Sequence, residues 1–135
     1  MDSVEILTLR DFGRQAIVLE SRRSENLGAV LAKVSDSLRQ TVRGSGEPMM
    51  NVLCSYAGDV WRVIVFPRIK HRPGVYFRKG AEQILISPAA VDLGGLIITP
   101  VEKDFNSVDA SLVEQIFTEV SLPPAAVDET ILRLS

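Results

Sequence analysis

The chain has 135 residues, of which 46% are hydrophobic and 24% charged, and its formal net charge is −2. This length supports a hydrophobic core, and we predict a single domain over residues 1–135. The charge balance argues against a nucleic-acid partner, and no apolar run reaches the roughly 20 residues of a membrane-spanning helix. One cysteine excludes an internal disulfide, and the acidic N-terminus is unlike a signal peptide, so we predict a cytoplasmic location.

The first half of the chain predicts a strand, a helix and a β-hairpin. Residues 15–19 form a short β-branched run typical of a strand. Residues 49–57 and 60–67 alternate on either side of Gly58-Asp59, which is the pattern of a hairpin. Both faces of the second hairpin strand are largely apolar, so we expect this strand to be central in its sheet. The helix between them is indicated by an apolar stripe at helical spacing: Leu27, Val30, Leu31, Val34 and Leu38.

The second half predicts two more strands and two helices. Residues 83–87 and 96–99 are short apolar runs, each followed by proline, and we expect both to be strands. Between them, Gly94-Gly95 indicates a positive φ or a close approach of the backbone to another group. Helices are expected around 111–120 and 124–134. Segregated strands and helices predict an α+β fold, with helices packed on a mainly antiparallel sheet.

Positive charge gathers in one segment. Residues 62–79 hold six Lys or Arg and one histidine but no acid. Arg68, Lys70 and Arg72 alternate, so in an extended loop they would project to one side and bind a phosphate or carboxylate. His71 could donate or accept a hydrogen bond at the same place. The alternative is that the arginines pair with the acidic residues of the C-terminal helices.

Other chemistry is weakly indicated. Cys54 lies in the middle of a predicted strand and reads as a small core residue. No second cysteine or histidine stands at ligand spacing, so we predict neither a metal site nor a cofactor. His71 is the only histidine in the chain, and a catalytic histidine would need an orienting partner that the sequence does not show.

Several segments carry a family resemblance. Asn51-Val52-Leu53, Trp61 and Val65-Phe66-Pro67-Arg68 resemble the N-L-L…W…V-P-R hairpin of ATP adenylyltransferases and diadenosine-tetraphosphate phosphorylases. These enzymes belong to the histidine-triad (HIT-like) superfamily. Residues 71–73, 84–95 and 97–100 are similar to uncharacterised bacterial relatives of that group and to plant GDP-galactose phosphorylases. The similarity runs from about residue 49 to residue 120.

The resemblance implies a domain without its own catalytic centre. The related enzymes use a His-x-His-x-His or His-x-His-x-Gln motif, which a chain with one histidine cannot contain. The chain therefore resembles the C-terminal half of a HIT-like fold, a non-catalytic half of a nucleotidyltransferase-like or phosphorylase-like protein. Such a half-fold leaves sheet edges uncovered, so we expect a homodimer or association with an N-terminal half that bears the triad. We predict no catalytic residue and one ligand site for phosphate or nucleotide: Asn51, Arg68, Lys70, His71 and Arg72.

Two other functions stay open at this point. The chain could be an interaction or scaffold module of unknown function that binds no small molecule. It could also be a complete enzyme that uses His71. We therefore leave it uncertain whether the chain has enzymatic activity, and expect none from the chain alone.

Overall fold

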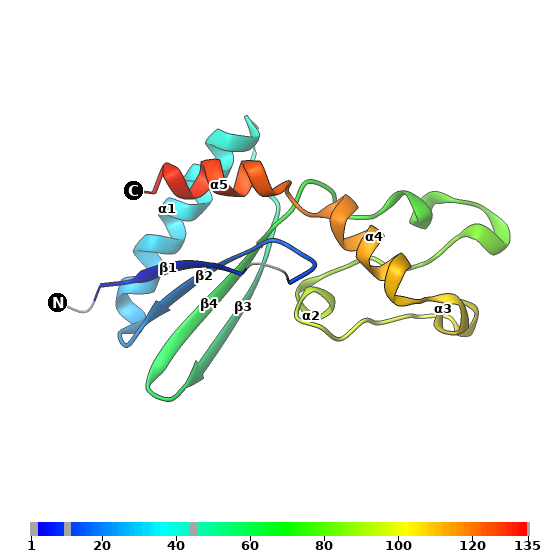
Figure 1. The fold of residues 1–135 in the computed structure, drawn as a ribbon, viewed down its shortest axis with the longest axis horizontal. Helices are drawn as coiled ribbons and strands as arrows, with labels where there is room; N and C mark the ends of the chain where they lie inside the picture. Colours follow the sequence, from blue (N-terminus) through cyan, green and yellow to red (C-terminus); the bar gives the residue numbers. More distant parts are fainter. Residues whose placement is uncertain (1–2, 10–11, 44–45, 135) are drawn as a thin grey trace.

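The computed structural model describes residues 3–9, 12–43 and 46–134. A four-stranded sheet occupies one side of the molecule, and a lobe of short helices and turns extends from one end of it (Figure 1). The strands are β1 (Glu5–Leu9), β2 (Ala16–Ser21), β3 (Met50–Ala57) and β4 (Val60–Pro67). The α-helices are α1 (Ser24–Val42), α2 (Ala90–Leu93), α3 (Glu102–Ser107), α4 (Ala110–Val120) and α5 (Pro124–Leu132), and 3-10 turns span Gly74–Phe77 and Gly80–Glu82.

The sheet is antiparallel throughout and has the strand order β1-β2-β4-β3. The prediction of an α+β fold with an antiparallel sheet is therefore confirmed, and β4 is central, as its two apolar faces indicated. The hairpin turn lies at Gly58 and Asp59, whose φ angles of 58° and 60° suit a two-residue turn between twisted strands. No pattern in the sequence predicted β1, which is short and, within the described residues, pairs with β2 alone.

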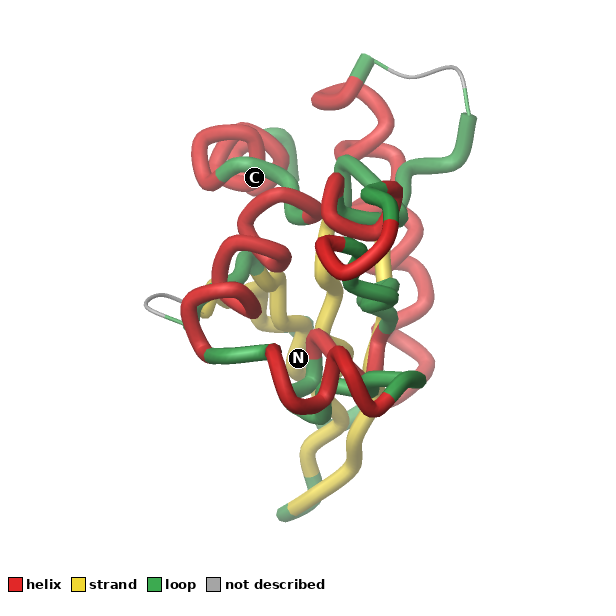
Figure 2. The backbone as a smooth tube through the Cα atoms, turned by 90° about the vertical axis from the view of Figure 1, so that its right-hand side faces the viewer, coloured by secondary structure: helices red, strands yellow, loops and turns green. Residues whose placement is uncertain are grey.

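One face of the sheet is covered by α1 and α5, which contact each other and cross in the view of Figure 1. Figure 2 shows helices, in red, beside the strands, in yellow. Side chains from β2 and β4 meet the helical stripe that the sequence predicted, and together they exclude water from the main core. This core contains Ile17, Leu19, Leu27, Val34, Leu38, Val63, Val65, Leu122 and Val127.

A second core joins the opposite face of the sheet to the lobe. Phe66 of β4 and Ala16 of β2 contact apolar residues of α2, α4 and the extended segment before α2. The lobe residues of this core are Ile84, Ile86, Leu93, Ile116 and Phe117. The lobe therefore packs against one end of the sheet and leaves the far end of the β3–β4 hairpin projecting freely (Figure 1).

The two strands predicted at residues 83–87 and 96–99 are wrong, because their backbone groups find other partners. The Leu85 amide donates to Asp104 at 2.7 Å, and the Ile84 amide donates to the Val75 carbonyl at 3.1 Å. In the second run the Ile98 amide donates to Asp92 at 3.0 Å. Apolar extended segments that look like strands are thus held by carboxylates and turns instead of by a neighbouring strand.

The Gly94-Gly95 prediction is confirmed, whereas the burial of Cys54 is not. Gly95 has a φ of 117°, and a Cβ on Gly94 would lie 2.8 Å from the Leu53 side chain, so α2 packs directly on β3 at this point. Cys54 is exposed, because β3 is an edge strand and the helical layer does not cover this part of it.

Asp104 ties α3 to the extended segment before α2. Its carboxylate is fully buried, accepts from the Leu85 amide at 2.7 Å and pairs with the Lys103 ammonium at 2.6 Å. Burial alone would raise the pKa of Asp104, but the hydrogen bonds and the charge of Lys103 outweigh burial and lower it.

Replacing this carboxylate should destabilise the protein. We expect Asp104→Asn to lower the free energy of unfolding by about 2 kcal/mol at neutral pH, because a charged acceptor is lost inside the lobe. Glu102→Gln, on an exposed neighbour, should change it by less than about 0.5 kcal/mol. Urea unfolding monitored by circular dichroism measures both values.

Asp104→Asn should also change how the free energy of unfolding depends on pH. The folded-state pKa of Asp104 lies below its unfolded value, so its stabilisation is present above the unfolded pKa and is lost as the pH falls through the acidic range. The difference between wild type and Asp104→Asn should therefore shrink below about pH 4. A difference that stayed constant down to the acid transition would contradict this assignment.

Candidate functional site

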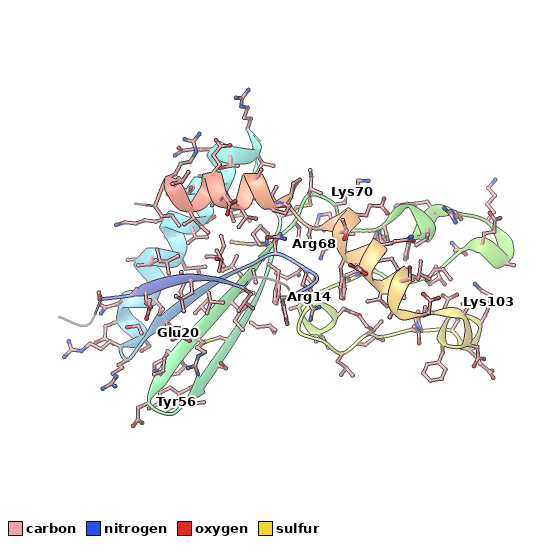
Figure 3. The ribbon with its side chains drawn as sticks, viewed as in Figure 1. Arg14, Glu20, Tyr56, Arg68, Lys70 and Lys103 are labelled. Carbon is pink, nitrogen blue, oxygen red and sulfur yellow. The ribbon has the colours of Figure 1, made fainter. Side chains whose placement is uncertain are left out.

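A cavity of about 420 Å³ opens where the end of β4 meets the segment before α2. It lies beside the junction between sheet and lobe, near the residues labelled Arg68 and Lys70 in Figure 3. Four of the five predicted ligand-binding residues line it, and Lys70 does not. The lining residues are Asn51, Arg68, His71, Arg72, Ser87, Pro88 and Ala89.

Arg68 is the most constrained side chain of this cavity. The residue is only 5% exposed, and all five N–H groups of its guanidinium donate to oxygens of the chain. The acceptors are the Asn51 side chain and the carbonyls of Pro88 (2.6 Å), His71 (2.7 Å) and Lys70 (2.8 and 3.2 Å). Arg68 therefore fastens β3, the basic loop and the segment before α2 to one another.

The acceptors of Arg68 are all neutral, so its charge is not cancelled by direct contact. Burial lowers the pKa of Arg68, and the negative charge of Asp92 offsets part of this effect from a distance. Asp92 is itself occupied, since its two oxygens accept from the amides of Ala89 and Ile98, each at 3.0 Å. The wall of the cavity thus carries the buried positive charge of Arg68, and the carboxylate of Asp92 makes its hydrogen bonds to backbone amides and not to Arg68.

Arg72 presents its charge at the mouth of the cavity. Its guanidinium lies 4.4 Å from the centre of the Tyr76 ring, a cation–π contact that limits the freedom of the side chain. Its Nε donates to the Ser87 hydroxyl at 3.3 Å. The two terminal nitrogens make no hydrogen bond within the described residues, and Arg72 is exposed. Arg72 is therefore oriented while four of its donors stay available.

Lys70 points elsewhere, and the expectation that the three alternating cations share one side is wrong. Its ammonium pairs with Glu119 of α4 at 3.0 Å, while Arg68 turns inward. The Gly74 amide donates to the same Glu119 oxygen at 3.0 Å. Hydrogen bonding by Lys70 lowers the pKa of Glu119. Lys70 thus fixes the basic loop to α4, which is the kind of pairing with C-terminal acids that the sequence left open for the arginines.

The alternation fails because β4 ends at Pro67 and the chain then turns along the end of α4. The Ile69 amide donates to the Val120 carbonyl at 2.9 Å, and Arg68 forms an isolated antiparallel bridge with Ser121. The loop is therefore hydrogen-bonded to the end of α4 and is not an extended strand.

Asn51 and His71 complete the polar lining. Asn51 accepts from Arg68 through its side-chain oxygen, which leaves the amide nitrogen as a donor. The His71 imidazole is exposed at the cavity and makes no ion pair with a described acid. Within the described residues no three His, Cys, Asp or Glu side chains are grouped closely enough to hold a metal ion.

Sequence reasoning missed the opposite wall of the cavity. Ser87 orients Arg72, and the Pro88 carbonyl accepts from Arg68, but both were assigned to the end of a strand. The only available signal was the Ser87-Pro88-Ala89 run, which the family resemblance included without a role.

Comparison with known proteins identifies the family. A model described as "GDPGP1-like, C-terminal domain" matches residues 1–131. The chain belongs to this family. The resemblance to a GDP-galactose phosphorylase-like protein is thereby confirmed for the C-terminal domain, and the assignment to the C-terminal part is correct. No curated protein and no solved structure matches the chain.

The family match covers both the sheet and the lobe, so the cavity between them lies inside the GDPGP1-like domain. In the parts of this domain that the structure describes, no helix has both the length and the apolar character needed to cross a bilayer.

Arg68 should contribute mainly to stability. We expect Arg68→Lys to lower the free energy of unfolding by about 2–4 kcal/mol, because lysine keeps the charge but cannot make the five hydrogen bonds of a planar guanidinium. Arg72→Lys should cost less than about 1 kcal/mol, since that side chain is exposed. Denaturant unfolding of the two variants makes the comparison, and equal losses would contradict the role given to Arg68.

Proposed function

We propose that this GDPGP1-like domain is the non-catalytic half of a phosphorylase-like protein, and that it holds a phosphate or the phosphate of a nucleotide in the cavity beside Arg72. We further propose that the domain contributes to oligomerisation. The observation that carries the ligand proposal is the oriented Arg72 guanidinium, whose terminal nitrogens are available next to the buried charge of Arg68.

The two arginines have different roles in this proposal. Arg68 does not bind the anion directly, because its five donors are already used. It shapes the cavity and supplies a positive charge that the low-dielectric surroundings screen only weakly. Arg72 makes the direct contact, since a guanidinium matches two phosphate oxygens at once. The Asn51 amide nitrogen and His71 add donors at the same wall.

A non-catalytic role follows from the same residues. The single histidine has no described acid beside it to orient the imidazole, and general acid–base or nucleophilic work by histidine depends on such a partner. We therefore assign His71 to binding. Lys70 is left out of the ligand contact, because Glu119 holds it on the other side of the loop.

A scaffold module that binds no small ligand is the second candidate. It is favoured by the use of two basic side chains within the fold: Arg68 fastens three segments, and Lys70 anchors the loop to α4. In that case Arg72 would be a surface residue held by Tyr76 and Ser87, with no ligand.

Titration with inorganic phosphate and with GDP separates the two functions. We expect measurable binding by isothermal titration calorimetry, and Arg72→Ala should weaken it by about tenfold or more, because charge-assisted hydrogen bonds are lost. Arg78→Ala is the matched control. It removes the same charge from the same basic segment but does not line the cavity, so it should change the affinity by less than about twofold.

If neither ligand binds, or if Arg72→Ala and Arg78→Ala weaken binding equally, the scaffold function is supported.

The variant His71→Ala tests whether the domain is catalytic. If wild type turns over a nucleotide and His71→Ala does not, the domain is an enzyme in its own right.

A further inference from the structure

The outer edge of β3 is open and lacks the features that usually protect an edge strand. β3 is the last strand of the sheet and runs for eight residues. Its sequence contains no Lys, Arg, Asp, Glu or Pro, and its register with β4 is continuous, without a bulge. Edge strands are normally blunted by charge, proline, bulges or shortness. The opposite edge, β1, has only five residues and begins with Glu5.

The hairpin turn determines which backbone groups of β3 face outward. In a two-residue hairpin the residues flanking the turn, Ala57 and Val60, form a hydrogen-bonded pair, and such pairs recur at every second residue. Odd-numbered residues of β3 therefore direct their N–H and C=O groups at β4. Those of Val52, Cys54 and Tyr56 point away from the sheet, and no other described strand pairs with them.

The side chains of the same residues are also uncovered. Val52 is 38% exposed and Tyr56 is 55% exposed, and Cys54 between them is exposed as well. All three lie on the face of the sheet that α1 and α5 cover further inward, where Cys54 and Tyr56 are opposite Val63 and Trp61. The edge therefore offers unpaired backbone groups and an apolar row of side chains together.

We propose that a second copy of this chain pairs with β3 in the antiparallel direction, with the two-fold axis at Cys54. The pairing would join two four-stranded sheets into one sheet of eight strands. It would bring Cys54 opposite Cys54 of the second copy, and Val52 opposite Tyr56 of the second copy. Aromatic–β-branched pairs of this kind stabilise neighbouring antiparallel strands.

A second copy suits this edge because the edge is uncharged. Two identical charged strands would place like charges face to face at a two-fold axis, which is destabilising, and β3 avoids that cost. In this register the outward backbone groups of the two strands also pair, since the N–H of Cys54 donates to the C=O of Cys54 in the second copy and the reverse bond forms as well. This inference specifies the oligomerisation in the proposed function and is independent of the anion cavity.

The mass in solution and two matched double variants test the pairing. Multi-angle light scattering of the purified chain should give twice the 14.8 kDa of one copy. V52K/Y56K places lysine opposite lysine and should weaken dimerisation by about tenfold or more. V52E/Y56K makes the same Tyr56 change but places glutamate opposite lysine, so it should remain dimeric.

Cross-linking reads the register directly. Residues facing each other in a hydrogen-bonded pair have Cα atoms about 5.5 Å apart, which is within the range of a disulfide. Mild oxidation should therefore link two copies through Cys54, the only cysteine. The control is C54S/L132C, which moves the thiol to an exposed position on α5 and should not link.

A monomeric wild-type chain, or a V52K/Y56K variant as dimeric as wild type, would overturn the proposal. If V52E/Y56K is as monomeric as V52K/Y56K, the register at Cys54 is wrong. Phosphate titration of V52K/Y56K keeps the two proposals apart, because loss of pairing should leave binding at Arg72 unchanged.

Discussion

The buried guanidinium of Arg68 is the interaction on which the junction of this molecule depends. It joins β3, the basic loop and the segment before α2 through five hydrogen bonds to neutral oxygens. A buried cation is costly to desolvate, and removing the Arg68 guanidinium would leave its acceptor oxygens without their donor. Because the acceptors come from three segments of the chain, which are β3, the basic loop and the segment before α2, the cavity forms only when all three are in place.

Buried carboxylates hold the segments of the lobe together, as the buried guanidinium of Arg68 does at the junction. Asp92 and Asp104 are buried carboxylates that accept from backbone amides of extended segments. These hydrogen bonds replace the strand pairing that apolar runs usually obtain from a neighbour. The lobe therefore needs no sheet of its own, and it packs its apolar side chains on one end of the β2–β4 surface. This leaves Arg72 at the mouth of the cavity and Lys70 on the far side of the loop.

The functional proposals occupy two separate places on one GDPGP1-like domain. The anion cavity lies at the junction with the lobe, whereas the open edge of β3 continues along the hairpin away from it. The free hairpin is long enough to pair because the lobe covers only one end of the sheet. The domain thus has one surface that we propose for a small anion and another that we propose for a second chain.

The sequence by itself determined the elements whose burial follows a simple period. The helical stripe of α1, the hairpin and the central position of β4 could all be predicted, because apolar spacing reports directly on which face meets the core. It also determined the family, since the hairpin and the residues after it carry local motifs. The tertiary structure decided which polar groups meet. Alternating cations gave no sign that Arg68 turns inward and Lys70 turns to Glu119, and β-branched runs gave no sign that Asp92 and Asp104 would take the place of neighbouring strands. The exposure of Cys54 was also decided by the tertiary structure, because burial at a strand position depends on whether a helix covers that edge. The partners of Lys70 and Asp104, which are Glu119 and Leu85, lie 49 and 19 residues away in the sequence, and local periodicity does not encode such pairings.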